Sequence, residues 1–289
     1  MTQEIGTILG VKVNSTTTAR VLRFVRNRIF QGKKFFIVTP NPEIVMRAEI
    51  DEDLNRVLEA SDLSLPDGIG LVAARKFLKL PNPKNPFKRA LTLFAQGLGV
   101  GISVLFNRKW VEESFNLIKG REMFMELIKL ANKKGWRVYL LGGENQVAQK
   151  SKETLKRSFK KVKIKADQGP LLTSDAKPRT NRDKEIEKKS IKRINKFKPH
   201  LLFVAFKFPR QEKWIEKYLG ELKVGGAMVV GGTFDYVSGH AKLPPTWLEE
   251  IGLEWLWRLI NDPKRIKRII NATAVFSLKV FLYKLNNRN

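Results

Sequence analysis

Short apolar runs alternate with longer amphipathic segments through the first two-thirds of the chain, and this alternation constrains the fold more than any other feature. The strand-like runs are residues 35–38, 63–65, 136–141, 162–166, 200–206 and 227–230. Patterns with helical spacing occupy residues 43–60, 69–78, 121–133, 146–159, 183–197 and 211–219. Strands that alternate with helices form a mostly parallel sheet covered by helices on both faces, so we predict a Rossmann-like α/β fold.

The carboxyl-terminal part of the chain predicts a helical appendage. A pair of prolines stops the preceding pattern, and residues 246–249 (Thr-Trp-Leu-Glu) form a capping box for a helix that reaches about Ile260. Residues 262–263 (Asp-Pro) then offer an N-cap and a first-turn proline for a further helix. We therefore expect an α/β core, residues 1–242, and a basic amphipathic helical appendage, residues 243–289, suited to a membrane surface.

An apolar insertion interrupts the core at about residues 80–116. Within it, Ala90 to Phe106 runs 17 residues without a charge, between the basic pairs 88–89 and 108–109. This length is borderline for crossing a bilayer, which takes about 20 residues, and three alternate glycines weaken a straight helix. The segment is either an inserted or interfacial membrane element, or a buried core helix or substrate lid.

The net charge indicates an anionic partner. Lys and Arg number 55 against 28 Asp and Glu, which gives a formal charge of +27. Nucleic acid, an acidic membrane surface and phosphorylated ligands all fit such an excess. Residues 150–198 hold 18 basic and 6 acidic residues. A solvated helix face explains most of these charges, and a phospholipid surface would satisfy them, so nucleic acid is not the expected partner.

Composition also limits metal and redox chemistry. The chain has no cysteine and only two histidines, His200 and His240. Disulfides, thiolate metal sites and cysteine nucleophiles are therefore excluded, and a histidine-rich metal centre is not expected. We expect neither a metal nor a cofactor. The amino terminus lacks the pattern of a signal peptide, so the chain is expected to stay in the cytoplasm, where a homo-oligomer remains open.

Polar side chains follow two neighbouring strands of the predicted sheet. Thr39 and Asn41 come after the first strand, in the sequence Thr-Pro-Asn-Pro, and Asp67 comes after the next, in Pro-Asp-Gly. Open α/β sheets bind their ligands in the crevice at the carboxyl ends of the strands. Asp67 is therefore our candidate for a general base. The alternative is a turn aspartate that bonds its own backbone.

Other candidate contacts follow later strands or lie on the appendage. Gly142-Gly143 separates a strand from a helix and could present backbone N–H groups to a phosphate, although a tight turn explains it about as well. Gln211 starts a helix after a strongly apolar strand and either reaches a ligand or occupies an exposed first turn. The appendage adds three arginines in an aromatic-rich stretch, which favours binding of an anion: Arg258, Arg265 and Arg268.

These elements, in this order, resemble the WecG/TagA/CpsF glycosyltransferases (glycosyltransferase family 26) of bacterial envelope polysaccharide synthesis. The match excludes roughly residues 79–116 and rests on six motifs: residues 39–42 (TPNP), 66–70 (PDGIG), 140–143 (LLGG), 209–212 (PRQE), 231–235 (GGTFD) and 252–259 (GLEWLWRL). The resemblance implies transfer of a sugar, typically N-acetylmannosamine or its uronic acid, from a UDP donor. The implied acceptor is an undecaprenyl-diphosphate-linked N-acetylglucosamine at the cytoplasmic membrane face, and the implied reaction inverts the anomeric centre without a metal.

The resemblance also implies residue roles. Asp67 would be the general base on the acceptor hydroxyl, and Thr39, Asn41 and Gln211 would line the substrate pocket. The three arginines would belong to an appendage that docks on the membrane and helps to close the site. A single base and arginines that stabilise a departing diphosphate are what direct displacement requires.

The sequence departs from the family pattern at two places. Where many members have Glu-Arg-x-x-Gly, this chain has residues 116–120 (Asn-Leu-Ile-Lys-Gly), so Leu117 stands at the arginine position. Lys119 or Arg121 is the hypothetical substitute. The family's Lys-Arg-Ala-Pro segment is here residues 242–245 (Lys-Leu-Pro-Pro). With the apolar insertion, these changes suggest an altered donor or acceptor, or a deeper hold on the bilayer.

Two functions from different classes therefore remain. The first is a membrane-associated glycosyltransferase that uses a UDP-sugar and a polyprenyl-diphosphate acceptor. The second is a non-catalytic basic module that binds anionic lipid or nucleic acid through residues 150–198, with steep salt dependence. The second leaves the polar residues at the strand ends unexplained.

Overall fold

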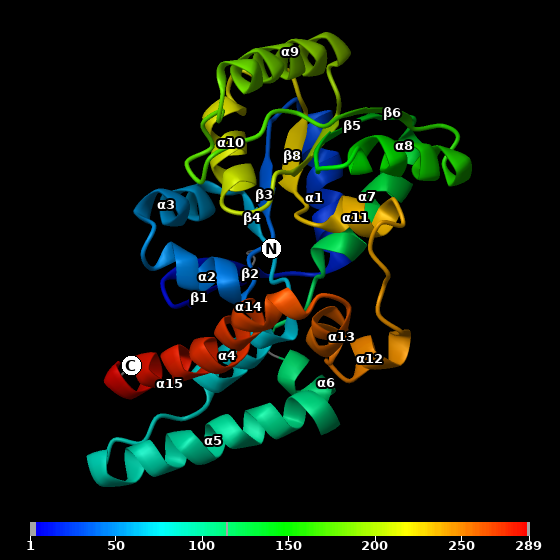
Figure 1. Ribbon diagram of the computed structural model, residues 1–289. Coiled ribbons are helices and arrows are strands. Elements are labelled where there is room, and N and C mark those ends of the chain that lie inside the picture. The colour runs from blue at the N-terminus through cyan, green and yellow to red at the C-terminus, as the bar shows by residue number, and fades with distance from the viewer. Residues whose placement is uncertain (1–3, 114, 288–289) are drawn as a thin grey trace.

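A computed structural model describes residues 4–113 and 115–287. The first three residues of the amino terminus, residue 114 of the insertion and residues 288–289 of the appendage lie outside this description. The central feature is a six-stranded sheet in the order β4-β3-β8-β7-β5-β6, in which every neighbouring pair is parallel (Figure 1). Its strands are β3 (Phe36–Val38), β4 (Leu63–Ser64), β5 (Arg137–Gly142), β6 (Lys163–Asp167), β7 (Leu201–Ala205) and β8 (Gly226–Val229). The predicted Rossmann-like α/β fold is confirmed.

Helices cover both faces of this sheet because its strands are apolar on both sides. Around β3, Phe35 and Ile37 enter one buried cluster while Phe36 and Val38 enter the other, as the two-residue period of a strand requires. One face is covered by α1 (Thr18–Phe30), α7 (Gly120–Lys134), α8 (Val147–Ser158) and α11 (Thr233–Val237). The other is covered by α2 (Pro42–Ala48), α3 (Glu52–Ala60), α9 (Asn181–Phe197) and α10 (Arg210–Tyr218).

Two parts of the core differ from the sequence prediction. The helix predicted over residues 43–60 is two helices, because the side chain of Asp51 accepts a hydrogen bond from the Leu54 N–H at 3.0 Å and starts α3 as its N-cap. Apolar spacing continues across the break and conceals it. The prediction also missed α1 and an antiparallel hairpin of β1 (Glu4–Ile8) and β2 (Val11–Ser15).

The carboxyl-terminal chain is helical, as predicted, but is divided differently. The single helix expected from Thr246 to about Ile260 is wrong, because Gly252, at φ +76°, separates two short helices. Thr246 is not an N-cap, since Pro245 holds that position without a side-chain hydrogen bond. The elements are α12 (Thr246–Glu250), α13 (Glu254–Asn261), a 3-10 turn (Pro263–Arg265), α14 (Ile266–Ile270), a π-helical segment (Asn271–Val275) and α15 (Phe276–Asn286).

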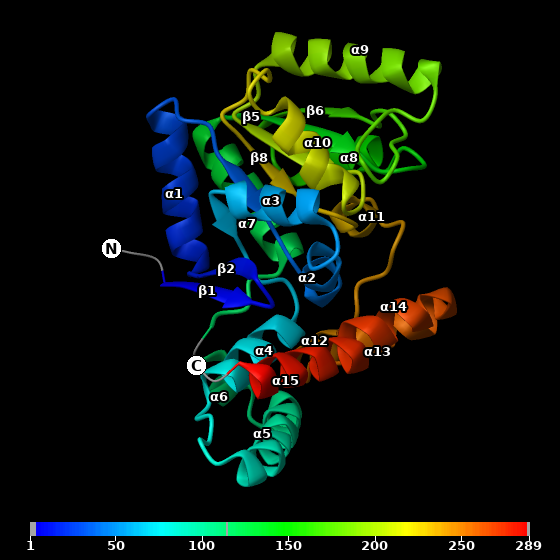
Figure 2. The same ribbon diagram turned by 90° about the vertical axis from the view of Figure 1, so that its left-hand side faces the viewer.

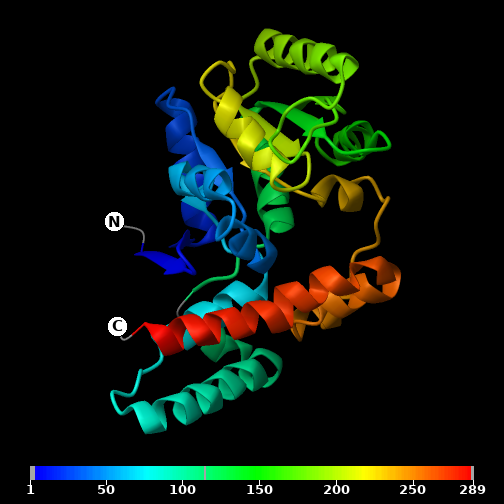
Figure 3. The same cartoon turned by 60° about the vertical axis from the view of Figure 1, so that its left-hand side comes forward.

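The apolar insertion folds beside these carboxyl-terminal helices. It follows α4 (Ile69–Lys79) and contains α5 (Pro86–Phe106) and α6 (Arg108–Glu112). Figures 2 and 3 show α5 below α4 and α15, away from the sheet, with α9 at the opposite end of the molecule. Leu93 and Val100 are buried against these neighbours. Among the described residues, α5 is the one helix long and apolar enough to cross a membrane.

The face of α5 that points away from the protein is a stripe of large apolar side chains. Its exposed members recur every three or four residues, which places them on one side of the helix: Phe87, Leu91, Phe94, Leu98, Ile102 and Leu105. Although the opposite side packs on α4 and α15, the exposure of this stripe shows that α5 is not a buried core helix. It is a helix with one protein-facing side and one apolar outer side.

Two buried cations join the insertion to the end of α15. Arg89 of α5 donates hydrogen bonds to the carbonyl oxygens of Lys284 at 2.9 Å and Asn287 at 2.8 Å. Lys284 in turn donates to the carbonyls of Phe77 and Leu80, and burial lowers its pKa to about 8. The insertion and the last helix therefore hold each other in place.

Candidate active site

The carboxyl ends of four neighbouring strands open into a cavity of 550 Å³, here called the polar cavity. Thr39 follows β3, Asp67 follows β4, Gln211 lies just after β7, and Gly231 follows β8, and all four line this cavity. The parallel sheet brings them together because parallel strands present their carboxyl ends at one edge.

Gly142 and Gly143, expected to offer N–H groups to a phosphate, are held by the sheet. The Gly143 N–H donates to the carbonyl oxygen of Ala205 at 3.0 Å, and Gly142 pairs with Ala205 in the β5–β7 ladder. A Cβ on Gly142 would meet that backbone at 2.8 Å. Gly143 lines the polar cavity and Gly142 lines neither cavity. This geometry favours the tight-turn alternative for the pair.

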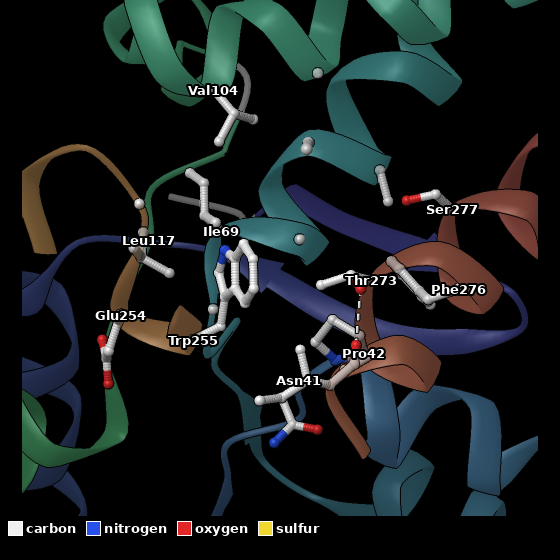
Figure 4. A pocket seen from close by; sticks show the side chains of 18 of the residues that line it. Asn41, Pro42, Ile69, Val104, Leu117, Glu254, Trp255, Thr273, Phe276 and Ser277 are labelled. Atoms are coloured by element: carbon white, nitrogen blue, oxygen red, sulfur yellow. Dashed lines mark hydrogen bonds between the residues drawn. The ribbon is translucent and has the colours of Figure 1, made fainter. Parts of the chain in front are cut away.

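A second cavity, here called the apolar cavity, lies between α4, α5 and the carboxyl-terminal helices and measures 570 Å³. Figure 4 shows Ile69 of α4, Val104 of α5 and Trp255 of α13 converging on it, with Phe276 of α15 on another side. The aliphatic and aromatic side chains of these helices make most of its wall.

Asp67 lies where the two cavities meet and lines both. Its backbone N–H donates to the Pro40 carbonyl oxygen at 2.9 Å, and its Oδ1 accepts the Gly120 N–H at 3.4 Å. Burial raises the pKa of Asp67 to about 6, with Arg258 acting to lower it and Glu254 to raise it. Asp67 is thus a partly exposed carboxylate whose pKa lies near neutrality, as a general base requires.

Asn41 and the three predicted arginines also line both cavities. The Asn41 Oδ1 accepts the Ile44 N–H at 3.0 Å as the N-cap of α2, so a ligand here would meet the Nδ2 group. Each arginine already has a carboxylate partner: Arg258 pairs with Glu254, Arg265 with Asp262, and Arg268 with Glu43.

The pair between Arg268 and Glu43 ties the appendage to the core. The Nε and Nη2 groups of Arg268 donate to the two Glu43 oxygens, at 2.8 and 2.7 Å. Since Glu43 lies in the first turn of α2, two residues after Asn41, this bidentate pair fixes α14 near the end of β3. Arg268 is thereby placed as a positioning residue as well as a cavity residue.

An ion-pair network closes the other side of the appendage on the core. Lys119 lies 2.7 Å from Glu249, and Arg121 lies 2.6 Å from it. Glu254 also belongs to the network, 3.7 Å from Lys119 and 3.6 Å from Arg121, and it pairs in turn with Arg258. Burial opposes ionisation of Glu249, but hydrogen bonding to Lys119 and the two cations outweigh it and keep the pKa below its usual value. Glu249 belongs to the predicted capping box and Glu254 to the motif at residues 252–259, but sequence reasoning assigned neither glutamate to this network.

Gln211 is held from both ends of its side-chain amide. Its Oε1 accepts the Gly231 N–H at 3.1 Å, and its Nε2 donates to the Glu212 Oε1 at 2.9 Å. Glu212 is fully buried, burial raises its pKa to about 7, and its Oε2 has no hydrogen-bond partner in the part of the chain described. Gln211 therefore orients the loop after β8 in addition to lining the cavity, a role that the sequence did not reveal.

Within residues 4–113 and 115–287, no group of three or more His, Asp or Glu side chains is placed to hold a metal ion. The cationic groups around the cavities are the arginines and lysines described above.

Comparison with known proteins shows the family of the chain. The family model described as "Glycosyl transferase WecG/TagA/CpsF family" matches residues 6–92 and 86–289. The chain belongs to this family. A relative from Bacillus subtilis (strain 168), named N-acetylglucosaminyldiphosphoundecaprenol N-acetyl-beta-D-mannosaminyltransferase, is 30% identical over 96% of this chain and 90% of its own length. A protein of the same name from Staphylococcus aureus (strain MW2) is 27% identical over 96% of this chain and 91% of its own length.

Membership of the WecG/TagA/CpsF family confirms the predicted resemblance and decides between the two function classes. The protein is a glycosyltransferase rather than a non-catalytic basic module. The basic region 150–198 lies in α8, β6 and α9, at the end of the molecule opposite α5 (Figure 1).

The departure at Leu117 has a structural counterpart. Leu117 lines the apolar cavity, as Figure 4 shows. Lys119 and Arg121, the hypothetical substitutes for the missing family arginine, line the polar cavity and are paired with Glu249. Both cations therefore border the site, but their charges already balance the appendage glutamates.

Proposed function

We propose that this glycosyltransferase transfers an N-acetylmannosamine-like sugar from a UDP donor to an undecaprenyl-diphosphate-linked N-acetylglucosamine, in cell-envelope polysaccharide or teichoic acid synthesis. The placement of Asp67 carries this proposal. Its carboxylate, with a pKa of about 6, lies where the polar cavity meets the apolar cavity and where the appendage arginines converge. The names of the relatives supply the acceptor and the sugar.

The proposed step is a single displacement. Asp67 accepts the proton of the acceptor hydroxyl while the oxygen of that hydroxyl forms a bond to the anomeric carbon of the donor sugar. The bond from that carbon to the diphosphate breaks on the opposite side, so the configuration inverts and UDP leaves with the electron pair. Arg258 and Arg265 line the polar cavity and would stabilise the charge on the departing diphosphate in place of a metal ion.

We further propose that the protein works at the cytoplasmic face of the membrane as a peripheral protein. The support is the apolar outer stripe of α5, in which Phe87 is 93% and Leu91 is 73% exposed. A helix packed on protein along one side and apolar on the other lies in the plane of the interface rather than across the bilayer. The high positive charge would add attraction to anionic lipids.

A donor panel tests the transfer reaction. The purified full chain is incubated with radiolabelled UDP-sugars and a lipid-diphosphate-linked N-acetylglucosamine, with and without EDTA. We expect transfer from UDP-N-acetylmannosamine, an inverted product by NMR, and equal rates with EDTA. Transfer from no UDP-sugar would overturn the proposed donor class, and a requirement for added magnesium would overturn metal independence.

A further inference from the structure

The structure has a second cavity that the proton transfer at Asp67 does not explain. We infer that the apolar cavity is the binding site for the first isoprene units of the acceptor's prenyl tail, with the diphosphate at the arginines and the sugar at Asp67. This inference rests on the proposed function, because it names where one part of the proposed acceptor binds. It adds a tail-binding site built from the insertion and the last helix.

The size and lining of the cavity fit an apolar ligand. Its volume of 570 Å³ lies within the range of about 300 to 1,000 Å³ that small-molecule sites span. Apart from the charged residues at the Asp67 end, its wall is mainly aliphatic and aromatic, including Phe77, Val280 and Phe281. Protein interiors ordinarily fill such space with side chains, so an open apolar cavity beside a reacting group indicates a ligand that fills it.

Small residues on both walls keep this cavity open. Gly97 and Gly101 of α5 line it opposite Ala73 and Ala74 of α4. A Cβ on Gly101 would meet nothing within 4 Å, and one on Gly97 would meet only the Phe77 ring at 3.8 Å. Neither glycine has the positive φ that would require it, and glycine weakens a helix. Small side chains at these positions therefore leave room for the apolar cavity.

Charge along the cavity matches an amphiphile with an anionic head. Arg258, Arg265 and Arg268 line the cavity where it meets Asp67, and a diphosphate carries the charge that these arginines would bind. Away from that end, the chain between Phe276 and Phe281 provides Val280 and the two aromatic rings as the wall. A diphosphate followed by a branched hydrocarbon therefore fits in one orientation, with its tail between α4, α5 and α15.

The cavity also opens toward α5, which gives a long tail a way out. Gly101 and Leu105 line the cavity and are exposed to solvent, and Leu105 belongs to the outer apolar stripe as well. A polyprenyl chain is much longer than this cavity, so most of it would pass α5 into the bilayer on which we propose that α5 rests. A ligand that is entirely soluble would gain nothing from this opening.

The test compares two acceptors and three variants. One acceptor carries a farnesyl tail on the N-acetylglucosaminyl diphosphate, and the other carries a methyl group in its place. Gly101→Leu and Ala73→Leu fill the cavity from its two walls. Gly99→Leu is the matched control, because Gly99 lies on the same helix, does not line the cavity and has nothing within 4 Å of its Cβ position.

We expect wild type and Gly99→Leu to prefer the farnesyl acceptor. Gly101→Leu should lower kcat/KM for that acceptor about tenfold, comparable to the loss of burial of about two methylene groups, and leave the methyl acceptor within about twofold. Ala73→Leu should do the same. Equal losses for both acceptors, or no tail preference in the wild type, would overturn the tail site while leaving the transferase function intact.

Calorimetric binding of farnesyl diphosphate separates this inference from the proposed function. Wild type and Gly99→Leu should bind it more tightly than methyl diphosphate, and Gly101→Leu should lose the difference. If no acceptor is glycosylated but this pattern appears, the tail site stands and the proposed reaction falls. If the pattern is absent, the tail site falls whether or not transfer occurs.

Discussion

The two cavities that meet at Asp67 are nearly equal in volume, 550 and 570 Å³, but they are built from different material. The polar cavity is made mainly by loops at the ends of parallel strands, whose positions are fixed by the ladder of the sheet, and arginines of the appendage complete it. The apolar cavity is made by helices contributed by an insertion and by the carboxyl-terminal chain. The comparison indicates that the sheet positions the general base, whereas the added helices supply the arginines and determine which acceptor can reach that base.

The largest predicted effect comes from the residue that both cavities share. Asp67→Asn keeps an oxygen that can accept the Gly120 N–H, but it cannot take a proton from an alcohol. We expect turnover to fall by about 10³-fold or more with both the farnesyl and the methyl acceptor, measured by release of UDP. Turnover close to that of the wild type would remove Asp67 from the mechanism.

A stability measurement checks that this variant is folded. The pKa of Asp67 is about 6 in the folded protein against an ordinary value of 3.8, so ionisation is penalised by folding. Above pH 6 the Asn variant should therefore be more stable, by up to about 3 kcal/mol in the free energy of unfolding. The difference should shrink as pH falls from 6 toward 4, where both side chains are neutral.

Arg258→Ala should have the next largest effect, because this arginine also borders both cavities. Loss of one group that stabilises developing charge typically lowers kcat by about 10²-fold or more, and we expect a loss of this order with either acceptor. Arg157→Ala, in an exposed arginine of α8 that lines neither cavity, is the control and should stay at wild-type activity. A loss confined to the farnesyl acceptor would show that Arg258 serves only the apolar side.

The pH dependence of kcat/KM should show which neighbouring charges determine the pKa of the general base, Asp67. We expect activity to rise with pH through a midpoint near 6, as Asp67 ionises. Since Glu254 raises this pKa and Arg258 lowers it, Glu254→Gln should move the midpoint to lower pH and Arg258→Ala should move it to higher pH. Shifts in the same direction for both variants would contradict this electrostatic assignment.

A smaller effect is expected on the membrane side of the comparison. Replacing Leu91, Leu98 and Ile102 of the α5 outer stripe by serine should reduce sedimentation with vesicles of phosphatidylglycerol and phosphatidylcholine by about tenfold. Serine replacements of Phe30 and Ile50, which are exposed but lie on α1 and beside α3, should not. Equal binding by all of these proteins would exclude the stripe as the docking surface.

Glu212→Gln should have the smallest effect on activity, within about threefold, because glutamine keeps an oxygen to accept the Gln211 hydrogen bond. The clearer effect of this substitution should be on the free energy of unfolding and its dependence on pH. Burial raises the pKa of Glu212 to about 7, so the variant should be more stable than the wild type above pH 7 and lose that advantage as pH falls toward 4.5. A constant difference across this range would show that Glu212 does not titrate there.

Much of the polar cavity could be predicted from the sequence because its residues directly follow predicted strands, which is a local pattern. A polar residue directly after an apolar run lies at the carboxyl end of a parallel strand, and this rule placed Thr39, Asn41 and Asp67 together before any coordinates. The rule did not reveal that the Gly143 N–H is taken up by Ala205, since a hydrogen bond to a neighbouring strand depends on register.

The apolar cavity could not be predicted because its walls are far apart in the sequence. Nothing near Gly101 indicates that it faces α4, and a charge-free segment is compatible with a span, a core helix or a helix lying in the interface. Arg258 and Arg265 pair with carboxylates four and three positions away in the sequence. The pair between Arg268 and Glu43, by contrast, was hidden, because it joins residues 225 positions apart. Such contacts follow from tertiary packing, which a local pattern does not encode.

The hydrogen bonds of Arg89 to the end of α15 bear on the order in which the molecule folds. They link residues 195 and 198 positions apart, and closing so long a loop costs chain entropy that few other contacts repay early. The Arg89 guanidinium can reach these two carbonyls only after the final helix has docked, so we expect α5 to reach its final packing late in folding. Removing the end of α15 would leave the Arg89 guanidinium without the two carbonyl oxygens to which it donates. Weaker membrane binding by such a truncated protein would therefore reflect the displacement of α5 as much as the loss of lipid contacts made by the removed residues.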